Sequence, residues 1–584
     1  MKRSIIIWLI GLVLVGCANR GVGPQGGPKD SIPPVPVKAE PEIGALNFQG
    51  DRIEVTFDEY IQLDNVAKHL IISPPQQNQP EVKARGKKLT VQFKDTLRDS
   101  TTYTLDFGSA VCDYREKVPL KGYSFYFSTG DEIDTLETFG RVYDAATLNP
   151  VEDVMVGIYS NTADSAFVSE PFLRIAKTDA EGRFRIGNIH PGTYRLYAVD
   201  DLSRDYRLTI GEALAYMDTT IRVQPQVVHE EDSTENHQHA ESYDLFLFKE
   251  EQQKLYLQRS SRDEQHRITF LFSSSPDSLP QIQALQDSLH YFTHYSAKGD
   301  TMTVWLTDSM SIARDSLFFE LKYRQTDSLY NLTWTTDTIR TIWRTPKLSQ
   351  QAKEALDRKN RNRRLELRSN AKSGFDIFDT LRLVCTTPIA SIAADSIHLY
   401  ERADSVLLPV AFAILTEDSL PMRLTLPAKL EAGKRYELQL DSAALHDIYG
   451  VTHVAANYSL QMKTVSEYST LRVKLTPFEP KARIQVLNSK DAVLREQAAS
   501  EEGAFFEYLK PDTYYLRLYI DENEDGKWTT GSWEAKRQPE KVYYFPEKIQ
   551  TKSNWDFEEE WNYQAVEQTK SKPSELIKAA PKKK

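Results

Sequence analysis

The chain has 584 residues, a formal net charge of −11 and an aromatic content of 11%. A length of this order predicts about four or five domains, and the acidic balance argues against nucleic acid as a partner, because phosphate binding requires a basic face. With only three cysteines in the chain, no disulfide framework is expected, so each domain must be stabilised by its own hydrophobic core.

The first residues have the pattern of an export signal. Lys2 and Arg3 precede an apolar run from Ile5 to Val15, which is too short to span a bilayer. The run ends at the tetrad Leu14-Val15-Gly16-Cys17. This tetrad resembles the lipobox of bacterial lipoprotein precursors, which implies that residues 1–16 are removed and that the Cys17 thiol receives a diacylglyceryl group. An ordinary signal peptide followed by an incidental cysteine is the alternative.

Several acyl chains on Cys17 anchor a protein to the membrane almost permanently. The residue after Cys17 is Ala18. An aspartate at this position would resemble the signal that retains bacterial lipoproteins in the inner membrane. The resemblance therefore implies an outer-membrane lipoprotein of the cell envelope. Whether it faces the periplasm or the medium stays open, since the following residues lack an acidic export cluster.

Residues 17–36 are rich in glycine and proline and predict a flexible tether. After it, Ile53, Val55 and Phe57 alternate with polar residues, as in a strand with one face in a core. Short strands of this kind, separated by turn residues, indicate a β-sandwich over 37–130. The pattern recurs in weaker form, so we expect related sandwiches over 243–345 and 366–465.

A different unit also occurs twice. Its first copy runs from Gly140 to Tyr194 and includes Glu181-Gly182-Arg183-Phe184, and its second copy includes Glu502-Gly503-Ala504-Phe505. In both copies a Glu-Gly pair supplies a tight turn, and a phenylalanine begins the next buried strand. We expect further β-sandwiches over 137–223 and 466–548.

Three segments lie outside these patterns. Residues 224–242 form an acidic linker, 346–365 predict a short basic helical linker, and 564–584 predict a disordered tail. The predicted fold class is therefore all-β, with tandem β-sandwiches and a short helical linker.

Two stretches resemble known families. Gly26-Gly27-Pro28-Lys29-Asp30 and the strand Ile53–Glu59 resemble Ig-like-domain lipoproteins of the Bacteroidetes, whose first domain is of the SbsA type. The unit Gly140–Tyr194 resembles the carboxypeptidase regulatory-like, or transthyretin-like, fold. The resemblance implies an anchored, extracytoplasmic protein of several domains, and it carries no catalytic residues over to this sequence.

The segment 521–527, Asp-Glu-Asn-Glu-Asp-Gly-Lys, is a candidate Ca²⁺ loop. Oxygen ligands at alternate positions before a glycine suit a hard cation, and the candidate ligands are Asp521, Asn523, Asp525 and Glu534. The match to an EF-hand loop is incomplete, because the twelfth position is Ser532. A hairpin with hydrated acids is the alternative. No other cofactor is expected.

The sequence lacks the Gly-x-Ser-x-Gly, phosphate-loop and His-Glu-x-x-His motifs. The leading hypothesis is therefore a non-catalytic, lipid-anchored scaffold or binding protein of the cell envelope, whose protein or glycan partner is unknown. One alternative is a glycan-binding accessory protein, with Trp305, Trp334 and Trp343 as the candidate aromatic row. The other is an extracytoplasmic hydrolase with an unrecognised site.

Overall fold

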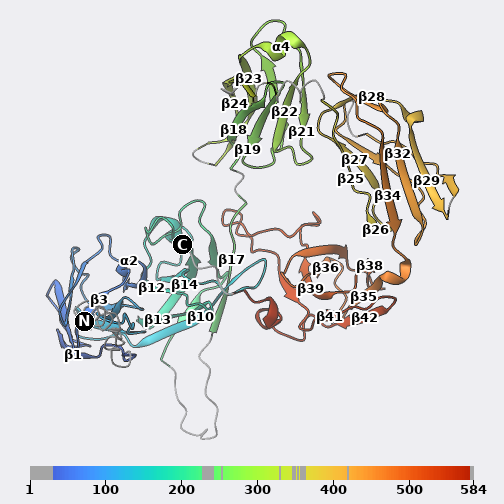
Figure 1. Cartoon of the computed structure of the whole chain (residues 1–584). Coiled ribbons are helices and arrows are strands. Elements are labelled where there is room, and N and C mark those ends of the chain that lie inside the picture. The colour runs from blue at the N-terminus through green and yellow to red at the C-terminus, as the bar shows by residue number, and fades with distance from the viewer. Residues whose placement is uncertain are drawn as a thin grey trace, which may run out of the picture. The chain divides into compact units, whose positions relative to one another are not determined.

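The computed structural model describes residues 30–225, 242–251, 254–327, 330–344, 350–351, 354, 363–404, 406–416 and 420–578. The chain divides into two compact units, one of Met1–Lys249 with Lys578–Lys584 and one of Glu250–Ile577. Strands dominate both units (Figure 1), and the prediction of an all-β chain is confirmed. Each domain described below surrounds a hydrophobic cluster of its own.

Domain 1 is a sandwich of two antiparallel sheets. One sheet has the order β1-β2-β6-β5 and the other the order β4-β7-β9. β3 and β8 form a separate two-stranded sheet. The alternation in β2 places Ile53, Val55 and Phe57 in the core, where each is 1% exposed. The elements are β1 (Pro36–Glu40), β2 (Arg52–Phe57), β3 (Ile61–Leu63), α2 (Val66–His69), β4 (Ile71–Ser73), β5 (Glu81–Arg85), β6 (Lys88–Gln92), β7 (Thr102–Asp106), β8 (Val111–Asp113) and β9 (Ser124–Ser128).

Domain 2 has a different topology. Its sheets have the orders β13-β10-β17 and β12-β11-β14-β15, and β16 pairs with β14. Its last strand, β17, lies parallel to the first, β10. The elements are β10 (Leu136–Asp144), β11 (Met155–Tyr159), α3 (Ala166–Ser169), β12 (Arg174–Lys177), β13 (Arg183–Ile189), β14 (Gly192–Val199), β15 (Leu214–Tyr216), β16 (Ile221–Val223) and β17 (Ser242–Leu247).

Domain 5 repeats the topology of domain 2 strand for strand. Its sheets are β38-β35-β42 and β37-β36-β39-β40, β41 pairs with β39, and β42 lies parallel to β35. The sequence repeat therefore reflects a duplicated fold. The elements are β35 (Ser469–Leu475), β36 (Ala482–Leu487), β37 (Val493–Ala498), β38 (Ala504–Leu509), β39 (Thr513–Ile520), β40 (Val542–Tyr544), β41 (Ile549–Gln550) and β42 (Asp556–Trp561).

These two domains correct the predicted boundaries. β17 completes domain 2, although the expected boundary at 243 assigned it to the next sandwich, and β42 lies beyond the expected end at 548. The physical reason is the same in both cases. Each closing strand pairs in parallel with the first strand of its domain, far back along the chain, and the alternation within a strand does not reveal such a distant partner. The acidic segment 224–242 precedes the last strand of domain 2, and most of it lies outside the described residues.

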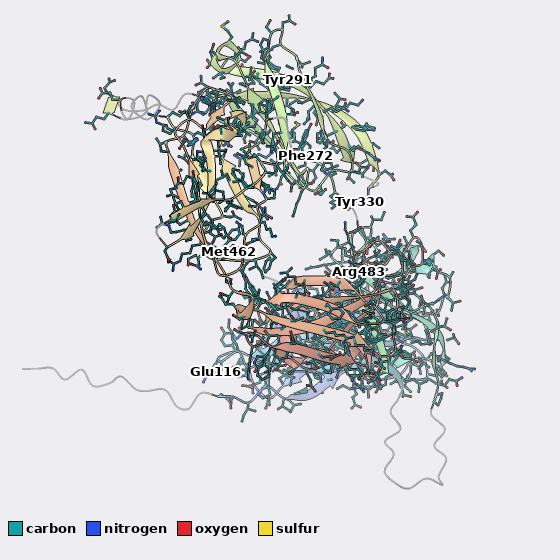
Figure 2. All side chains as sticks on the ribbon, turned by 90° about the vertical axis from the view of Figure 1, so that its right-hand side faces the viewer. Glu116, Phe272, Tyr291, Tyr330, Met462 and Arg483 are labelled. Atoms are coloured by element: carbon teal, nitrogen blue, oxygen red, sulfur yellow. The ribbon has the colours of Figure 1, made fainter. Side chains whose placement is uncertain are left out.

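Domain 3 has the strand order of domain 1, with sheets β18-β19-β22-β21 and β20-β23-β24. Phe272 and Tyr291, which Figure 2 labels, both belong to its larger sheet, and Phe272 packs edge-on against Tyr323 in the core. The elements are β18 (Leu257–Glu264), β19 (Arg267–Phe272), β20 (Gln281–Ala284), β21 (Tyr291–Tyr295), β22 (Thr301–Leu306), α4 (Ser309–Ala313), β23 (Ser316–Thr326) and β24 (Leu332–Ile342).

Domain 4 is a variant of the same sandwich, with sheets β25-β27-β31 and β26-β34-β32-β29-β30 and the pair β28-β33. The elements are β25 (Leu367–Ser369), β26 (Ser373–Phe375), β27 (Leu381–Cys385), β28 (Ile389–Ile392), η1 (Ala394–Ser396), β29 (Ile397–Ala403), β30 (Val406–Pro409), β31 (Arg423–Leu426), β32 (Arg435–Leu440), β33 (Leu445–Asp447), β34 (Ala456–Met462) and η2 (Val465–Glu467). Of the expected helical linker 346–365, most residues lie outside the described part, and Gln350, Gln351 and Glu354 are helical.

The prediction of a disordered tail from Gln564 is wrong for residues 564–577. This stretch contains the short helices η3 (Gln568–Lys570) and η4 (Ser574–Leu576) and packs on domain 5. Leu576 is 2% exposed, and the ammonium group of Lys572 lies 2.7 Å from a carboxylate oxygen of Asp491. The many lysines of the tail suggested disorder, but one of them is buried in an ion pair.

Candidate functional site

The expected lipid anchor lies outside the described residues, which begin at residue 30. Acylation of Cys17 therefore stays a prediction. In the described ranges, no helix is long and apolar enough to cross a bilayer.

The candidate calcium loop follows β39 directly. Asp521 is 5% exposed, and its two carboxylate oxygens accept hydrogen bonds from the backbone N–H groups of Asp525 (3.1 Å) and Gly526 (2.9 Å). Asn523 Oδ1 also accepts from the N–H of Asp525, and Asp525 Oδ1 accepts from the N–H of Lys527. Asp521, Asn523 and Asp525 thus share one tight loop, which their oxygens hold together by bonds to backbone donors.

The acid that completes this loop is Glu540 and not Glu534. Glu540 is 8% exposed, and its carboxylate accepts from the N–H groups of Glu522 (2.9 Å) and Thr529 (2.8 Å). Burial raises the pKa of Glu540 in spite of these hydrogen bonds. Glu534, the ligand expected from the sequence, is exposed. The EF-hand pattern does not point to Glu540, because this residue lies beyond the twelve positions that the pattern covers.

Domain 2 contains the same arrangement. Asp201 accepts from the N–H groups of Asp205 and Tyr206, and Glu212 accepts from those of Ser203 and Thr209. Among the described residues, no group of three or more His, Cys, Asp or Glu residues that could hold a metal ion occurs. Calcium binding at the domain 5 loop stays a prediction.

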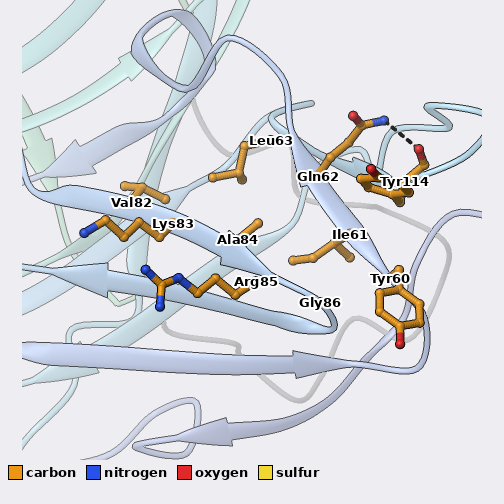
Figure 3. A pocket seen from close by; sticks show the side chains of 10 residues that line it. All are labelled: Tyr60, Ile61, Gln62, Leu63, Val82, Lys83, Ala84, Arg85, Gly86 and Tyr114. Atoms are coloured by element: carbon orange, nitrogen blue, oxygen red, sulfur yellow. Dashed lines mark hydrogen bonds between the residues drawn. The ribbon is translucent and has the colours of Figure 1, made fainter.

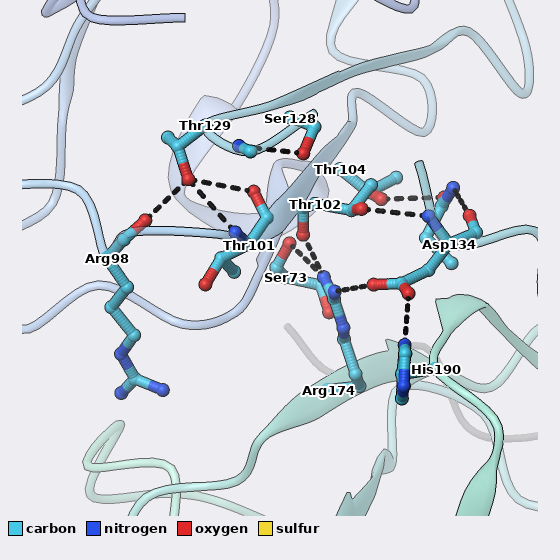
Figure 4. Close-up of polar contacts among 12 residues, drawn as sticks. Ser73, Arg98, Thr101, Thr102, Thr104, Ser128, Thr129, Asp134, Arg174 and His190 are labelled. Atoms are coloured by element: carbon cyan, nitrogen blue, oxygen red, sulfur yellow. Dashed lines mark hydrogen bonds and ion pairs between the residues drawn. The ribbon is translucent and has the colours of Figure 1, made fainter. Parts of the chain in front are cut away.

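A second polar cluster joins domains 1 and 2 within the first unit (Figure 4). Arg174, on β12 of domain 2, has a side chain only 6% exposed, and its guanidinium donates to the backbone carbonyls of Ser73 (3.3 Å) and Thr102 in domain 1. It also forms an ion pair with Asp134 at 3.3 Å. Burial lowers the pKa of Arg174, and the nearby Asp134 carboxylate opposes that effect.

Other bonds support this junction. Thr104 Oγ1 donates to Asn188 Oδ1 at 2.8 Å, and the Asn188 amide donates to the backbone carbonyl of Asp134 at 2.7 Å. Asp134 also contacts His190 Nδ1 at 3.0 Å. Hydrogen bonds of Arg174 and Asn188 therefore link the two domains, and the buried guanidinium has acceptors in both.

Domains 4 and 5 meet at a comparable junction inside the second unit. The Asp376 side chain is 5% exposed and accepts from Lys510 (2.8 Å), Lys463 (3.0 Å) and the Tyr468 hydroxyl (2.8 Å). Burial alone would raise the pKa of Asp376, but the hydrogen bonds from Lys510, Tyr468 and Lys463 outweigh it and lower the pKa to about 2.

The described surface of domain 1 has a groove of about 680 Å³ between β3 and β5 (Figure 3). Its lining combines an apolar floor, two exposed tyrosines and two cationic side chains, and it contains no carboxylate: Tyr60, Ile61, Gln62, Leu63, Val82, Lys83, Ala84, Arg85, Gly86 and Tyr114. No residue of the lining was singled out from the sequence, because the two strands that form it lie apart in the chain.

The tryptophans do not form the row that a glycan platform requires. Trp305 is 1% exposed but lies on the face of β22 opposite to the core residues Val304 and Leu306, whereas Trp334 is 51% exposed.

Comparison with known proteins assigns the first domain. Residues 30–129 match the family model of the bacterial Ig-like domain. A search of curated proteins gives no match.

Among solved structures, the chain is similar to the N-terminal part of the bacterial S-layer protein SbsC (12% identity, TM-score 0.16), over 29% of this chain and 44% of that one. It spans less than half of that protein fragment. The Bacillus anthracis TIE protein matches at 10% identity and TM-score 0.12, over 92% of this chain and 76% of that one. SGBP-B of the Bacteroides ovatus mixed-linkage glucan utilization locus, in complex with a mixed-linkage heptasaccharide, matches at 10% identity and TM-score 0.16, over 64% of this chain and 88% of that one. At such TM-scores these likenesses carry no functional argument.

The chain is therefore a protein of tandem β-sandwiches whose first domain is a bacterial Ig-like domain.

Proposed function

We propose that the chain is a lipid-anchored scaffold of the cell envelope, attached through Cys17, that holds binding surfaces at fixed spacing and performs no catalysis. The observation that carries the proposal is the Arg174 junction. A buried guanidinium bonded to both sandwiches would restrict the hinge motion expected of domains with small polar interfaces. The Asp376 junction would restrict motion between domains 4 and 5 in the same way.

The finer assignments belong to the same proposal. Domains 2 and 5 share one topology with a parallel closing strand, which supports their assignment as carboxypeptidase regulatory-like, or transthyretin-like, modules. The apolar run before Cys17 supports an outer-membrane lipoprotein. The burial of Trp305 argues against a glycan-binding platform built on tryptophan, because a buried side chain cannot stack on a sugar.

Replacement of the anchoring sulfur tests the proposal. In cells that express the full chain, the wild-type protein should partition into detergent, and Cys17→Ser should move it to the aqueous phase, because the acyl chains are lost. Cys112→Ser is the matched control, since this buried thiol lies in the core of domain 1. Unchanged partitioning of Cys17→Ser would refute the anchor. In a separate experiment, protease treatment of intact cells would establish which side of the envelope the domains face.

A further inference from the structure

The groove of domain 1 opens where two strands part. The backbone N–H of Ile61 donates to the carbonyl of Gly86 at 3.0 Å and ties the start of β3 to the end of β5. From this point β3 pairs with β8, whereas β5 stays paired with β6. The outer backbone edge of β5 therefore borders the groove, as the diverging ribbons of Figure 3 show.

β5 is the open edge of this sandwich. At the opposite edge of its sheet, β1 contains Pro36 and an irregular register between Pro36 and Lys38, and both features discourage pairing with a further strand. In the other sheet, β9 is covered by backbone bonds from residues 44–48, and β4 packs against β12. β5 pairs with β6 in regular register from Glu81 to Arg85 and has no proline.

The side chains around this edge define what can add to it. Val82 and Ala84 face the sandwich interior next to Ile61 (3% exposed) and Leu63, so a strand beside β5 would place every second side chain over an apolar floor. Lys83 and Arg85 lie on the opposite face, about 7 Å apart along the strand. The described residues offer no hydrogen-bond partner for the Arg85 guanidinium, and Lys83 pairs only with the exposed Glu81.

We propose that the β5 edge of domain 1 binds an extended peptide in which carboxylates alternate with apolar residues, by addition of a strand to the sheet. The carboxylates lie opposite Lys83 and Arg85, the apolar side chains cover Ile61 and Leu63, and Tyr60 and Tyr114 (62% and 65% exposed) close one end of the groove. Antiparallel pairing with β5 of a second copy, centred on Lys83, would place Lys83 opposite Lys83, which is unfavourable, although it would also place Glu81 opposite Arg85.

This inference rests on the binding role in the proposed function but not on the anchor, so its test uses the chain from residue 18 onward, without lipid. The probe is a fluorescent peptide with the core Glu-Val-Glu-Val-Glu, and the control peptide has Lys-Val-Lys-Val-Lys. Fluorescence anisotropy should show saturable binding of the acidic peptide at about 100 µM, weakened by salt. The basic peptide should bind at least about tenfold more weakly.

Two variants make the test specific. The double variant Lys83→Glu with Arg85→Glu should bind the acidic peptide at least about tenfold more weakly than the wild type does. It should bind the basic peptide instead. Lys38→Glu, which reverses an exposed lysine on the other edge strand of the same sheet, should change neither affinity by more than about twofold. Amide hydrogen exchange should slow within 81–85 when the acidic peptide is bound.

Three results would overturn the inference. One is the absence of binding by the acidic peptide up to about 1 mM. Another is equal binding to the wild type and to the doubly charge-reversed variant, provided that both have the same melting temperature. The third is binding of a β-glucan hexasaccharide that is lost in Tyr60→Ala and that displaces no peptide, because the groove would then be a sugar site. None of these results depends on whether Cys17 is acylated.

Discussion

Asp201 and Asp521 lie at equivalent positions in domains 2 and 5, and each accepts the same pair of backbone hydrogen bonds. In both cases one oxygen accepts from the residue four positions later and the other from the residue five positions later. The loops also share left-handed backbone at matching positions, with φ of 61° at Arg204 and at Glu524. The duplicated fold therefore includes the conformation of this loop, and the calcium-like pattern in domain 5 has a structural function before any cation is considered.

Removal of the Asp521 carboxylate should destabilise domain 5. In Asp521→Ala the N–H groups of Asp525 and Gly526 lose a buried charged acceptor, so we expect the free energy of unfolding to fall by about 2–3 kcal/mol. Glu524→Ala is the matched control, because it removes an exposed carboxylate from the same loop, and its effect should stay below about 1 kcal/mol. Urea denaturation monitored by tryptophan fluorescence measures the free energy of unfolding of both variants. Equal effects would show that the Asp521 bonds do not order the loop.

The calcium prediction for this loop has its own test. If Asp521, Asn523 and Asp525 bind Ca²⁺, millimolar Ca²⁺ should raise the melting temperature of the wild type, because a ligand that binds only the folded state stabilises it. The rise should be absent in Asp521→Ala, and Mg²⁺ should not replace Ca²⁺ in such a flexible oxygen site. An unchanged melting temperature of the wild type would refute the site.

Loss of Arg174 should uncouple domains 1 and 2. Arg174→Met leaves the Asp134 carboxylate and the carbonyls of Ser73 and Thr102 without their buried donor, and breaking a pair of this kind costs about 3–5 kcal/mol. Scanning calorimetry should show a lower first transition and separate unfolding of the two domains. Arg183→Met removes an exposed arginine of domain 2 that binds Asp179 and Glu181, and it should leave the unfolding transitions almost unchanged, because exposed ion pairs contribute little to stability. A single unshifted transition in Arg174→Met would contradict the rigid junction.

The sequence predicts the strands of this protein better than it predicts their partners. Alternation such as Ile53-Val55-Phe57 reports which face of a strand is buried, because side chains point to opposite faces in turn. It does not reveal a pairing partner that is distant in the sequence, so the predicted domain 2 ends before β17 and the predicted domain 5 ends before β42. Arg174 could not be singled out either, because its partners Ser73 and Thr102 lie 101 and 72 positions away along the chain.

Asp376 should make the second unit sensitive to acid. Its pKa is lowered to about 2 in the folded protein, below the ordinary value of 3.8, so the carboxylate stabilises the fold above about pH 4 and loses this contribution as the pH falls toward 2. In Asp376→Asn the charge is absent at every pH. We expect a loss of about 2 kcal/mol at neutral pH and a smaller loss at pH 2.

Denaturation curves at several pH values measure the effect of Asp376. Asp395→Asn, at an exposed position of domain 4, is the control and should follow the wild type throughout. If the difference between the wild type and Asp376→Asn did not shrink between pH 4 and pH 2, the ion pairs with Lys510 and Lys463 would not be the source of the stabilisation.

The C-terminal segment should detach from domain 5 when Lys572 is replaced. The Lys572 and Asp491 side chains are both 2% exposed, and the Tyr544 hydroxyl donates to the same carboxylate at 3.0 Å. Lys572→Met leaves that carboxylate buried without its cation, so we expect a loss of about 3–5 kcal/mol and rapid hydrogen exchange over 568–577. Lys570→Met, at a lysine whose side chain is 71% exposed, should leave exchange unchanged.

A double replacement separates the charge effect from the packing of the segment. When Asp491→Asn is combined with Lys572→Met, no unpaired charge remains, and asparagine keeps nearly the volume of aspartate and is tolerated at the left-handed backbone of position 491 (φ 63°). The double variant should therefore recover most of the stability that Lys572→Met loses, and exchange over 568–577 should slow again. If the double variant were as unstable as the sum of the two single variants, the segment would be held by the specific geometry of Lys572, Asp491 and Tyr544 and not by the pairing of charge alone.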